Sequence, residues 1–418
     1  MTASRKLSPT EILSLAGLLF FLPLLEAPKN LFWLAFVIFW LGRAMFRGAG
    51  WGGAWRPARD LPFFALLAAA GAACLLAPPF PQKWNEVGDV LRYTLLGLLI
   101  SRSQFSEKQL FLVLIAILAG TLVAAAHGWW AWRVAETTAM FELNSVGHTN
   151  HSAIYLCMVA LGTLGSLIAA WNRLNNGWRI TLISALLFLT LLLATGESRG
   201  ALVAYVIGFV VIITFVAPAR WCLRILSLSA ILLVAALVTQ PYLIDKSVSQ
   251  LTSPATTTKT SYRVELARTA LIASEMKPFT GIGSGNFGLM TVERVAAHLE
   301  RSGKSFEPER YFHSSHAHNF YMNTLAERGL LGMMALGLLM YFWIRKLIAK
   351  RQHLRSAPHQ QVLLWSIGIA GFVGVFITGI FNTSLHHEHG LLSMFALGLL
   401  MGIRTDRQSA QHTSCSPT

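Results

Sequence analysis

Long apolar runs separated by short polar connections make up most of this chain. Clear examples are residues 110–130, 180–194 and 362–380, which consist mainly of Leu, Ile, Val, Ala, Gly and Phe. About 17–25 such residues are needed to cross roughly 30 Å of hydrocarbon as a helix. The runs lack alternation of apolar and polar positions, which favours helices over a membrane barrel. The pattern therefore predicts an all-α polytopic membrane protein.

Twelve apolar segments have the character of membrane spans. The fourth is the weakest because Glu86, Asp89 and Arg92 interrupt it, and the last is short. The approximate limits are 11–25, 30–47, 61–78, 85–101, 109–130, 150–171, 178–195, 200–217, 221–239, 319–345, 361–381 and 388–404.

One long polar stretch breaks this rhythm and divides the chain. The expected parts are nine spans in 1–240, a large loop in 241–318, three spans in 319–405 and a disordered cytoplasmic tail in 406–418.

The large loop itself contains helical periodicity. It opens with a Ser/Thr-rich stretch, 252–261, of little expected structure, and Ser261 is a candidate helix cap. Apolar residues then recur at helical spacing from Tyr262 to Ala273 and again from Leu289 to Leu299. The loop is therefore expected to fold as a helical hairpin over the outer membrane face.

Composition and charge agree with a membrane location. Of 418 residues 54% are hydrophobic and only 13% are charged, whereas a soluble domain averages about 25% charged residues. The net charge of +15 would suit nucleic-acid binding, but the positions of the charges do not. The four cysteines are scattered singly, which predicts neither a disulfide framework nor a metal site.

The basic residues indicate which side of the membrane each connection faces. With a cytoplasmic N-terminus and alternating spans, residues such as Arg43, Arg102 and Arg345 fall inside. The short outside loops hold Lys29, Lys83, Arg133 and Arg199. This is the positive-inside rule, so both termini are expected in the cytoplasm and the large loop outside. No cleavable signal peptide is expected, because a second apolar run follows the first closely.

Arg199 lies in a tight outside connection, 195–201, between two apolar spans. So short a connection keeps the guanidinium at the depth of a lipid-linked phosphate, which arginine binds through a planar fork of donors. A snorkelling arginine, or one paired with Glu197, fits the pattern equally well. Arg263 opens the first loop helix, where a lone arginine is usually only solvated.

Residues 281–288 are rich in glycine. Their backbone N–H groups could bind a phosphate at the start of the next helix. The stretch lacks the Gly-Lys-Ser/Thr ending of a P-loop and follows no predicted strand. A tight turn is therefore the favoured interpretation.

His313, His316 and His318 stand where the loop meets the tenth span. A metal site would normally recruit carboxylates or cysteines as well, and none is adjacent in the sequence. A general base fits better, because imidazole titrates near neutral pH. The start of a helix would favour the neutral form of His318, which a base needs. A surface histidine that caps a loop is the plain alternative.

Further polar groups lie near the outer ends of other spans. His148 and His151 flank the entrance of the sixth span, where they could line the same cavity or only make the helix entrance polar. The run His386–His389 has the residue types of a metal cluster, but hydrogen bonds to lipid phosphate or plain solvation are favoured. Arg92 is a charge within a span, which suggests function by default, although it could simply pair with Asp89.

Three stretches carry a resemblance. They are Ser198-Arg199-Gly200-Ala201, then Tyr262-Arg263 through Lys277-Pro278 to the glycine-rich run, then His318-Asn319 followed after nine residues by Gly329-x-x-Gly332. Together they resemble the O-antigen ligase family of bacterial inner-membrane proteins, a group that includes O-antigen polymerases and protein O-oligosaccharyltransferases. The likeness covers about residues 190–340, and the twelve-span layout with one large outside loop also fits.

The resemblance implies an inverting, metal-independent glycosyltransferase with a GT-C-like fold and no cofactor. Its donor would be O-antigen on undecaprenyl pyrophosphate and its acceptor the lipid A–core oligosaccharide, with the active site facing the periplasm and no role for nucleic acid. Family catalytic roles fall on His318, Arg199 and Arg263. Substrate binding is expected of His316, Asn319, His313, Arg92 and His148.

Two rival functions stay open. A polymerase or protein oligosaccharyltransferase would use much the same residues with another acceptor, but the full His-Asn…Gly-x-x-Gly pattern favours the ligase. A lipid or sugar transporter usually carries charges or broken helices near the membrane midplane. Here the polar residues gather at the outer ends of the spans, apart from the group around Arg92.

Overall fold

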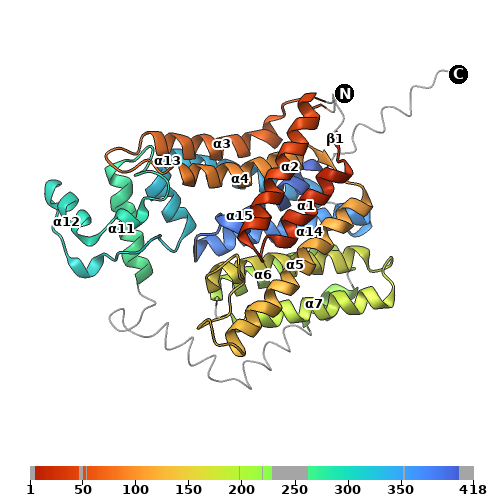
Figure 1. Cartoon of the computed structure of the whole chain (residues 1–418). Helices are drawn as coiled ribbons and strands as arrows, with labels where there is room; N and C mark the ends of the chain where they lie inside the picture. The colour runs from red at the N-terminus through yellow and green to blue at the C-terminus, as the bar shows by residue number, and fades with distance from the viewer. Residues whose placement is uncertain are drawn as a thin grey trace.

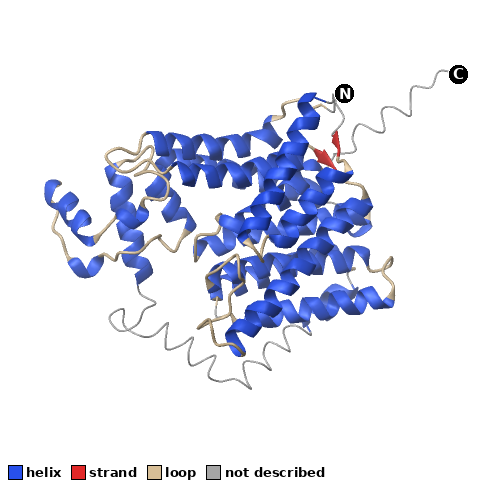
Figure 2. Ribbon diagram, viewed as in Figure 1, coloured by secondary structure: helices blue, strands red, loops and turns tan. Residues whose placement is uncertain are grey.

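The structure, a computed structural model, is described for most of the chain, and the described part is almost entirely helical (Figure 2). The described residues are 5–46, 50–52, 54–196, 198–218, 220–227, 262–351 and 354–403. Some sequence expectations lie outside them: most of the ninth span (221–239), the Ser/Thr-rich stretch, Ser261, Glu197 and the tail 406–418.

The helices follow the apolar runs of the sequence. The helices before the loop are α1 (Pro9–Phe21), α2 (Glu26–Phe46), α3 (Pro57–Leu75), α4 (Trp84–Ser101), α5 (Glu107–Arg133), α6 (Thr149–Ala170), α7 (Asn176–Thr195) and α8 (Arg199–Val216). The later elements are α11 (Tyr262–Met276), α12 (Val292–Arg301), α13 (Phe320–Arg351), α14 (His359–Phe372), the π-turn η4 (Val373–Ile377), the 3-10 turn η5 (Thr378–Ile380) and α15 (His387–Gly402). Short 3-10 turns also cover Phe287–Leu289, Pro308–Arg310 and Leu354–Ser356.

Within the described residues, 8 helices are long and apolar enough to cross a membrane. They are α2, α3, α5, α6, α7, α8, α13 and the segment His359–Ile380 that starts with α14. The protein is thus a multi-pass membrane protein, but the expected count of twelve spans is not confirmed, and most of the ninth expected span lies outside the described residues. α1 has 13 residues and α15 has 16, and α4 carries three charged side chains.

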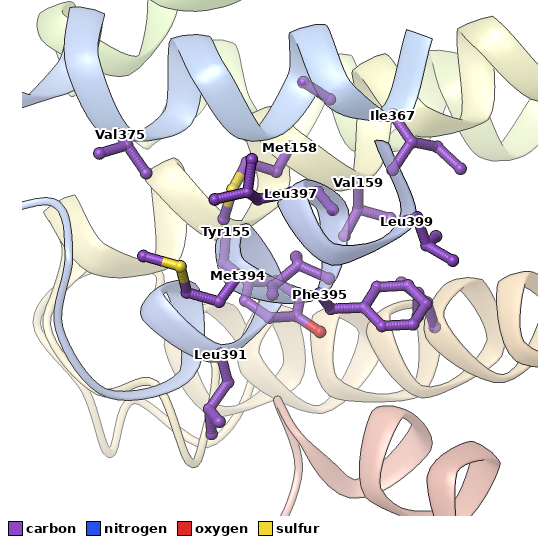
Figure 3. Packing of buried hydrophobic residues seen from close by; sticks show 14 of the residues in the cluster. Tyr155, Met158, Val159, Ile367, Val375, Leu391, Met394, Phe395, Leu397 and Leu399 are labelled. Carbon is purple, nitrogen blue, oxygen red and sulfur yellow. The ribbon is translucent and has the colours of Figure 1, made fainter. Parts of the chain in front are cut away.

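The helices pack in two groups around a buried centre. α3, α4 and α13 run side by side, and α6 and α7 belong to a second group (Figure 1). α14 packs on α6, and α15 packs on α4 and α14. Figure 3 shows side chains of α6, such as Tyr155 and Met158, meeting Met394 and Phe395 of α15 in this centre. Because both helices are apolar all round, they fit positions enclosed by other helices.

The two ends of the molecule differ in character. The strands β1 (Arg5–Lys6) and β2 (Ser103–Gln104) pair in parallel at one end, and α11 and α12 stand at the other (Figure 1). Near the strands, two buried carboxylates each bind two arginines: Glu11 binds Arg5 and Arg43, and Asp60 binds Arg59 and Arg102. We call these the basic end and the loop end. Their separation agrees with the charge pattern of the sequence.

The large loop contains two helices, α11 and α12, where apolar residues recur at helical spacing. α11 buries Leu266, Ala270 and Ala273, and α12 buries Val295 and Leu299. These residues form a small apolar core of their own, beside the main one. α11 also packs on α13. The hairpin is therefore fixed to the helical bundle by its apolar face.

A crossing of two backbones attaches the hairpin to α13. Gly329 interrupts α13 with φ 57° and ψ −153°, a conformation open essentially to glycine alone. Four backbone hydrogen bonds of 2.9–3.0 Å join residues 278–283 to residues 326–331. A Cβ on Gly281 would lie 2.3 Å from the carbonyl carbon of Glu327. The tight-turn interpretation of the glycine-rich stretch is confirmed, and the N–H groups of Ile282 and Gly283 are committed to α13.

Candidate functional site

His318 lies in the last turn of the loop, just before α13, with a left-handed φ of 49°. The next residue fixes this turn. The Asn319 side-chain oxygen accepts the Met322 N–H at 3.0 Å, and its amide donates to the Ile380 carbonyl at 3.0 Å. The His316 ring lies 4.2 Å from the His318 ring, centroid to centroid. Asn319, expected to bind substrate, thus caps α13 and ties it to η5.

The start of α8 packs against the turn that follows η5. A Cβ on Gly200 would lie only 2.6 Å from the Cβ of Phe381, so glycine permits this close approach. The neighbouring Asn382 is buried and forms a side-chain hydrogen bond with His318. Arg199, the first residue of α8, is therefore held next to the same turn as His318.

Arg263, in the first turn of α11, is the third member of this group. Partial burial lowers its pKa, and the nearby Arg199 guanidinium lowers that pKa further. The Arg263 charge in turn lowers the pKa of His318. Among the described residues, neither guanidinium has a carboxylate within ion-pair distance. The two neighbouring guanidinium charges repel each other, and an anion bound between them would relieve that repulsion.

More histidines surround the same space, brought there by α6 and α15. The His151 ring lies 5.7 Å from His148, 6.1 Å from His386 and 5.0 Å from His389. The His148 charge influences both His316 and His318. We call these six residues the histidine cluster: His148, His151, His316, His318, His386 and His389.

Burial within the cluster lowers the pKa of three of its histidines, His316, His318 and His386. Burial, and then the neighbouring His318 and His148, lower the pKa of His316 to about 4. Burial, and then His387 and His151, lower the pKa of His386 to about 3. The pKa of His318 is also lowered, by burial first and Arg263 next, and its bond with Asn382 opposes the shift only in part. At neutral pH these imidazoles are free bases, which can accept a proton.

Three of the sequence motifs thus meet at one place, and a family model covers them. Residues 183–337 match the model described as O-antigen ligase. The chain carries an O-antigen ligase family domain. This domain extends from within α7 into α13 and contains Arg199, Arg263 and His318. No curated protein matches the chain.

Some of the cluster comes from outside the matched family domain. His148, His386 and His389 lie on either side of it in the sequence, as does Asn382. Asn382 was missed by the sequence analysis, although a short polar Asn-Thr-Ser run between two apolar spans could have indicated it. The family domain therefore needs helices from both ends of the chain to complete its surroundings.

Glu327 is a second residue that the sequence analysis missed. It is a buried carboxylate inside α13, and intramembrane charges deserve scrutiny by default. Its Oε1 accepts the N–H of Phe287 at 3.2 Å, and its carbonyl accepts the N–H of Gly283. The neighbouring Arg328 donates to the Ser284 hydroxyl at 3.1 Å. These bonds hold the glycine-rich turn of the family domain on α13.

Two expected substrate-binding residues, His313 and Arg92, make contacts outside the cluster as defined here. His313 is exposed, and its Nδ1 is 3.5 Å from the Met290 carbonyl. Arg92 in α4 is half-exposed and pairs with Asp89 at 3.1 Å along the same helix face. Asp89 also lies 3.9 Å from His387, whose ring is 3.5 Å from that of His386, so this pair stands at the edge of the cluster. The simpler alternative for Arg92, pairing within its helix, agrees with this geometry.

In the run His386–His389, the expectation of plain solvation is wrong for Glu388 and His389, whereas His387 is exposed. Glu388 and His389 are buried, and Glu388 forms an ion pair with Lys29, which is also buried. Lys29 was placed in an outside loop from the sequence, but it belongs to α2. A buried pair of opposite charges is what makes burial of either residue tolerable. Among the described residues, no group of three or more His, Cys, Asp or Glu side chains could hold a metal ion.

Proposed function

We propose that this protein is an O-antigen ligase. It transfers O-antigen polysaccharide from undecaprenyl pyrophosphate to the lipid A–core oligosaccharide at the periplasmic face of the bacterial inner membrane. The observation that carries the proposal is the meeting of a neutral His318 with the Arg199–Arg263 pair inside an O-antigen ligase family domain. A base beside two arginines that have no carboxylate partner among the described residues suits the transfer of a sugar away from a phosphate.

The proposed reaction is a direct displacement. His318 removes the proton from the acceptor hydroxyl as its oxygen attacks the anomeric carbon of the donor. The bond to the pyrophosphate oxygen breaks on the opposite face, so the configuration inverts. Arg199 and Arg263 bind the departing pyrophosphate, whose negative charge grows in the transition state. The products are the new glycosidic bond and undecaprenyl pyrophosphate, and His318 carries the proton.

The membrane contributes to this chemistry as well. Both substrates are amphiphiles that would lie in one leaflet, so their reacting groups share one depth. Confinement to that depth removes part of the entropy cost of bringing two reactants together. The fixed hairpin and the backbone crossing at Gly329 hold Arg263 over the same place.

A transfer assay with purified protein tests the proposal. With lipid-linked O-antigen and lipid A–core, we expect product formation that EDTA leaves unchanged. His318→Ala should reduce the rate by about 10²–10⁴-fold, because that is the usual contribution of a general base. His313→Ala is the matched control and should retain activity, since His313 lies outside the cluster.

The same assay separates the rival functions. A pilin-like acceptor offered together with lipid A–core should remain unmodified. Modification of the pilin instead, or transfer that stops with EDTA and returns with added metal, would contradict the proposed acceptor or mechanism. Movement of the donor across liposomes without bond formation would indicate a transporter.

A further inference from the structure

A large apolar cavity lies in the half of the bundle that faces away from the histidine cluster. Its volume is about 740 Å³, and its walls come from α5, α6, α7, α14 and α15. This volume falls in the usual range of about 300–1,000 Å³ for sites that hold small molecules. The transfer chemistry proposed above makes no use of it.

The cavity reaches the lipid-facing surface of the bundle. Phe111 of α5 and Trp178 of α7 line it and are 48% and 40% exposed. Their rings meet edge to face at 5.7 Å. These helices are membrane spans by length and composition, so the surroundings of this opening are hydrocarbon and not water. An apolar space that opens into hydrocarbon suits a lipid chain.

The charged side chains that line the cavity lie at the basic end of the molecule. Glu107, Lys108, Arg173 and His359 line the cavity there, at or near the starts of α5, α7 and α14. The Arg173 guanidinium is 3.3 Å from Glu107 and 3.2 Å from the His359 ring nitrogen. Lys108 adds a second full positive charge, so the mouth carries a net positive charge that complements a phosphate.

The inner end of the cavity is closed. Met158, Leu392 and Phe395 line it and are buried, and Tyr155 is buried one turn nearer to the histidine cluster (Figure 3). A chain that enters at the basic mouth therefore ends in a sealed apolar pocket, short of His318. A polyprenyl tail extending from the reaction site would instead have to end among charged side chains.

We infer that this cavity binds an anionic glycerophospholipid of the leaflet at the basic end. One acyl chain fills the space between α5, α6 and α7, and the phosphate lies against Lys108 and Arg173. This inference is independent of the proposed transfer activity, because its readout is bound lipid.

Native mass spectrometry of the full chain tests the inference. The protein is purified, stripped of lipid and mixed with phosphatidylglycerol in detergent micelles. A Cβ on Gly162, which lines the cavity, would contact nothing within 4 Å, so Gly162→Leu fills the cavity without a clash. We expect it to weaken phosphatidylglycerol binding by about tenfold, because the leucine displaces methylenes of the acyl chain.

Matched variants make the result decisive. Gly337→Leu, on an exposed face of α13 and also free of contacts within 4 Å, should bind lipid as the wild type does. Ala119→Leu fills the cavity from the opposite wall and should repeat the loss if Gly162→Leu fails to fold. Arg173→Ala should remove the preference for phosphatidylglycerol over phosphatidylcholine.

Three results would overturn the inference. They are equal lipid binding by Gly162→Leu and wild type, equal binding of the two phospholipids by wild type, or a dimeric mass that Gly162→Leu alone reduces to a monomer. The last result would assign the cavity to a second copy of the chain.

Discussion

His318 occupies a backbone conformation that few residues other than glycine adopt, and its neighbours hold it there. Its φ is 49°, in the left-handed region. Asn319 caps the following helix, and Asn382 bonds the imidazole from a turn 64 positions later in the numbering, between η5 and α15. The direction of one imidazole therefore depends on two asparagines, which position it without any need to touch substrate.

The lowered pKa of His318 predicts the pH profile of transfer. A base must be unprotonated to act, and burial with Arg263 lowers the pKa of His318 below its ordinary value of about 6.5. The rate should therefore stay constant from pH 8 down through pH 6.5 and fall only in more acidic solution. Asn382→Ala removes a bond that raises this pKa, so it should move the fall to lower pH. A fall that begins above pH 7 would contradict the assignment of His318.

The arginine pair predicts that lysine cannot replace Arg199 without a loss in the rate of transfer. Arg199→Lys keeps the charge but loses the planar fork of donors, so we expect a rate lower by about 10²-fold. Thermal stability should change little, since Arg199 is exposed. Arg268→Lys on the same hairpin as Arg263 is the control and should have no effect on transfer. Full activity of Arg199→Lys would show that charge alone suffices.

At the scale of elements, the glycine-rich turn and α13 act as one unit. The N–H groups of Ile282 and Gly283 bond α13 and that of Phe287 bonds the Glu327 side chain, so these three groups are not available to a phosphate. Lys277, next to this turn, donates to the carbonyls of Leu76, Ala77 and Pro78, which directly follow α3. The second and third motifs of the family therefore fix the position of α11 relative to α3 and α13, which in turn fixes Arg263.

Gly329→Ala should detach the glycine-rich turn from α13. A Cβ at this position would lie 2.6 Å from the Gly281 nitrogen, and the backbone conformation is costly for any other residue. We expect a loss of about 1–3 kcal/mol or more in stability, with transfer falling as α11 shifts. Gly337→Ala in the same helix meets nothing within 4 Å and should be neutral or stabilising. Melting temperature and transfer rate, measured for both variants, check this.

At the scale of the whole molecule, the histidine cluster links stability to pH. The pKa of His316 is lowered to about 4 and that of His386 to about 3, against an ordinary value of about 6.5. Between these values the unfolded chain binds more protons than the folded one, so stability falls as the pH drops below 6.5. The melting temperature in detergent should therefore fall between pH 7 and pH 5. His386→Gln should reduce that fall, whereas the exposed His313→Gln should not; equal falls in all three proteins would contradict this link.

The sequence predicted the elements well because each depends on local pattern. Apolar length determines where α2, α5 and α8 run, and the bias of basic residues agrees with the opposite ends on which β1 and the hairpin lie. Helical spacing likewise predicted α11 and α12. The three motifs also named His318, Arg199 and Arg263, because the family pattern is written in short contiguous stretches.

Only the tertiary structure decided which polar groups belong together. His386 and His389 join His151 from 235 or more positions away, whereas His313, only five residues before His318, lies apart. Lys29 pairs with Glu388 across nearly the whole chain, and α15 is a central helix despite its short length. Such contacts arise from the packing of α6, α8, α13 and α15 against one another. Packing depends on the shapes of surfaces far apart in the chain, which no local pattern of apolar and polar residues specifies.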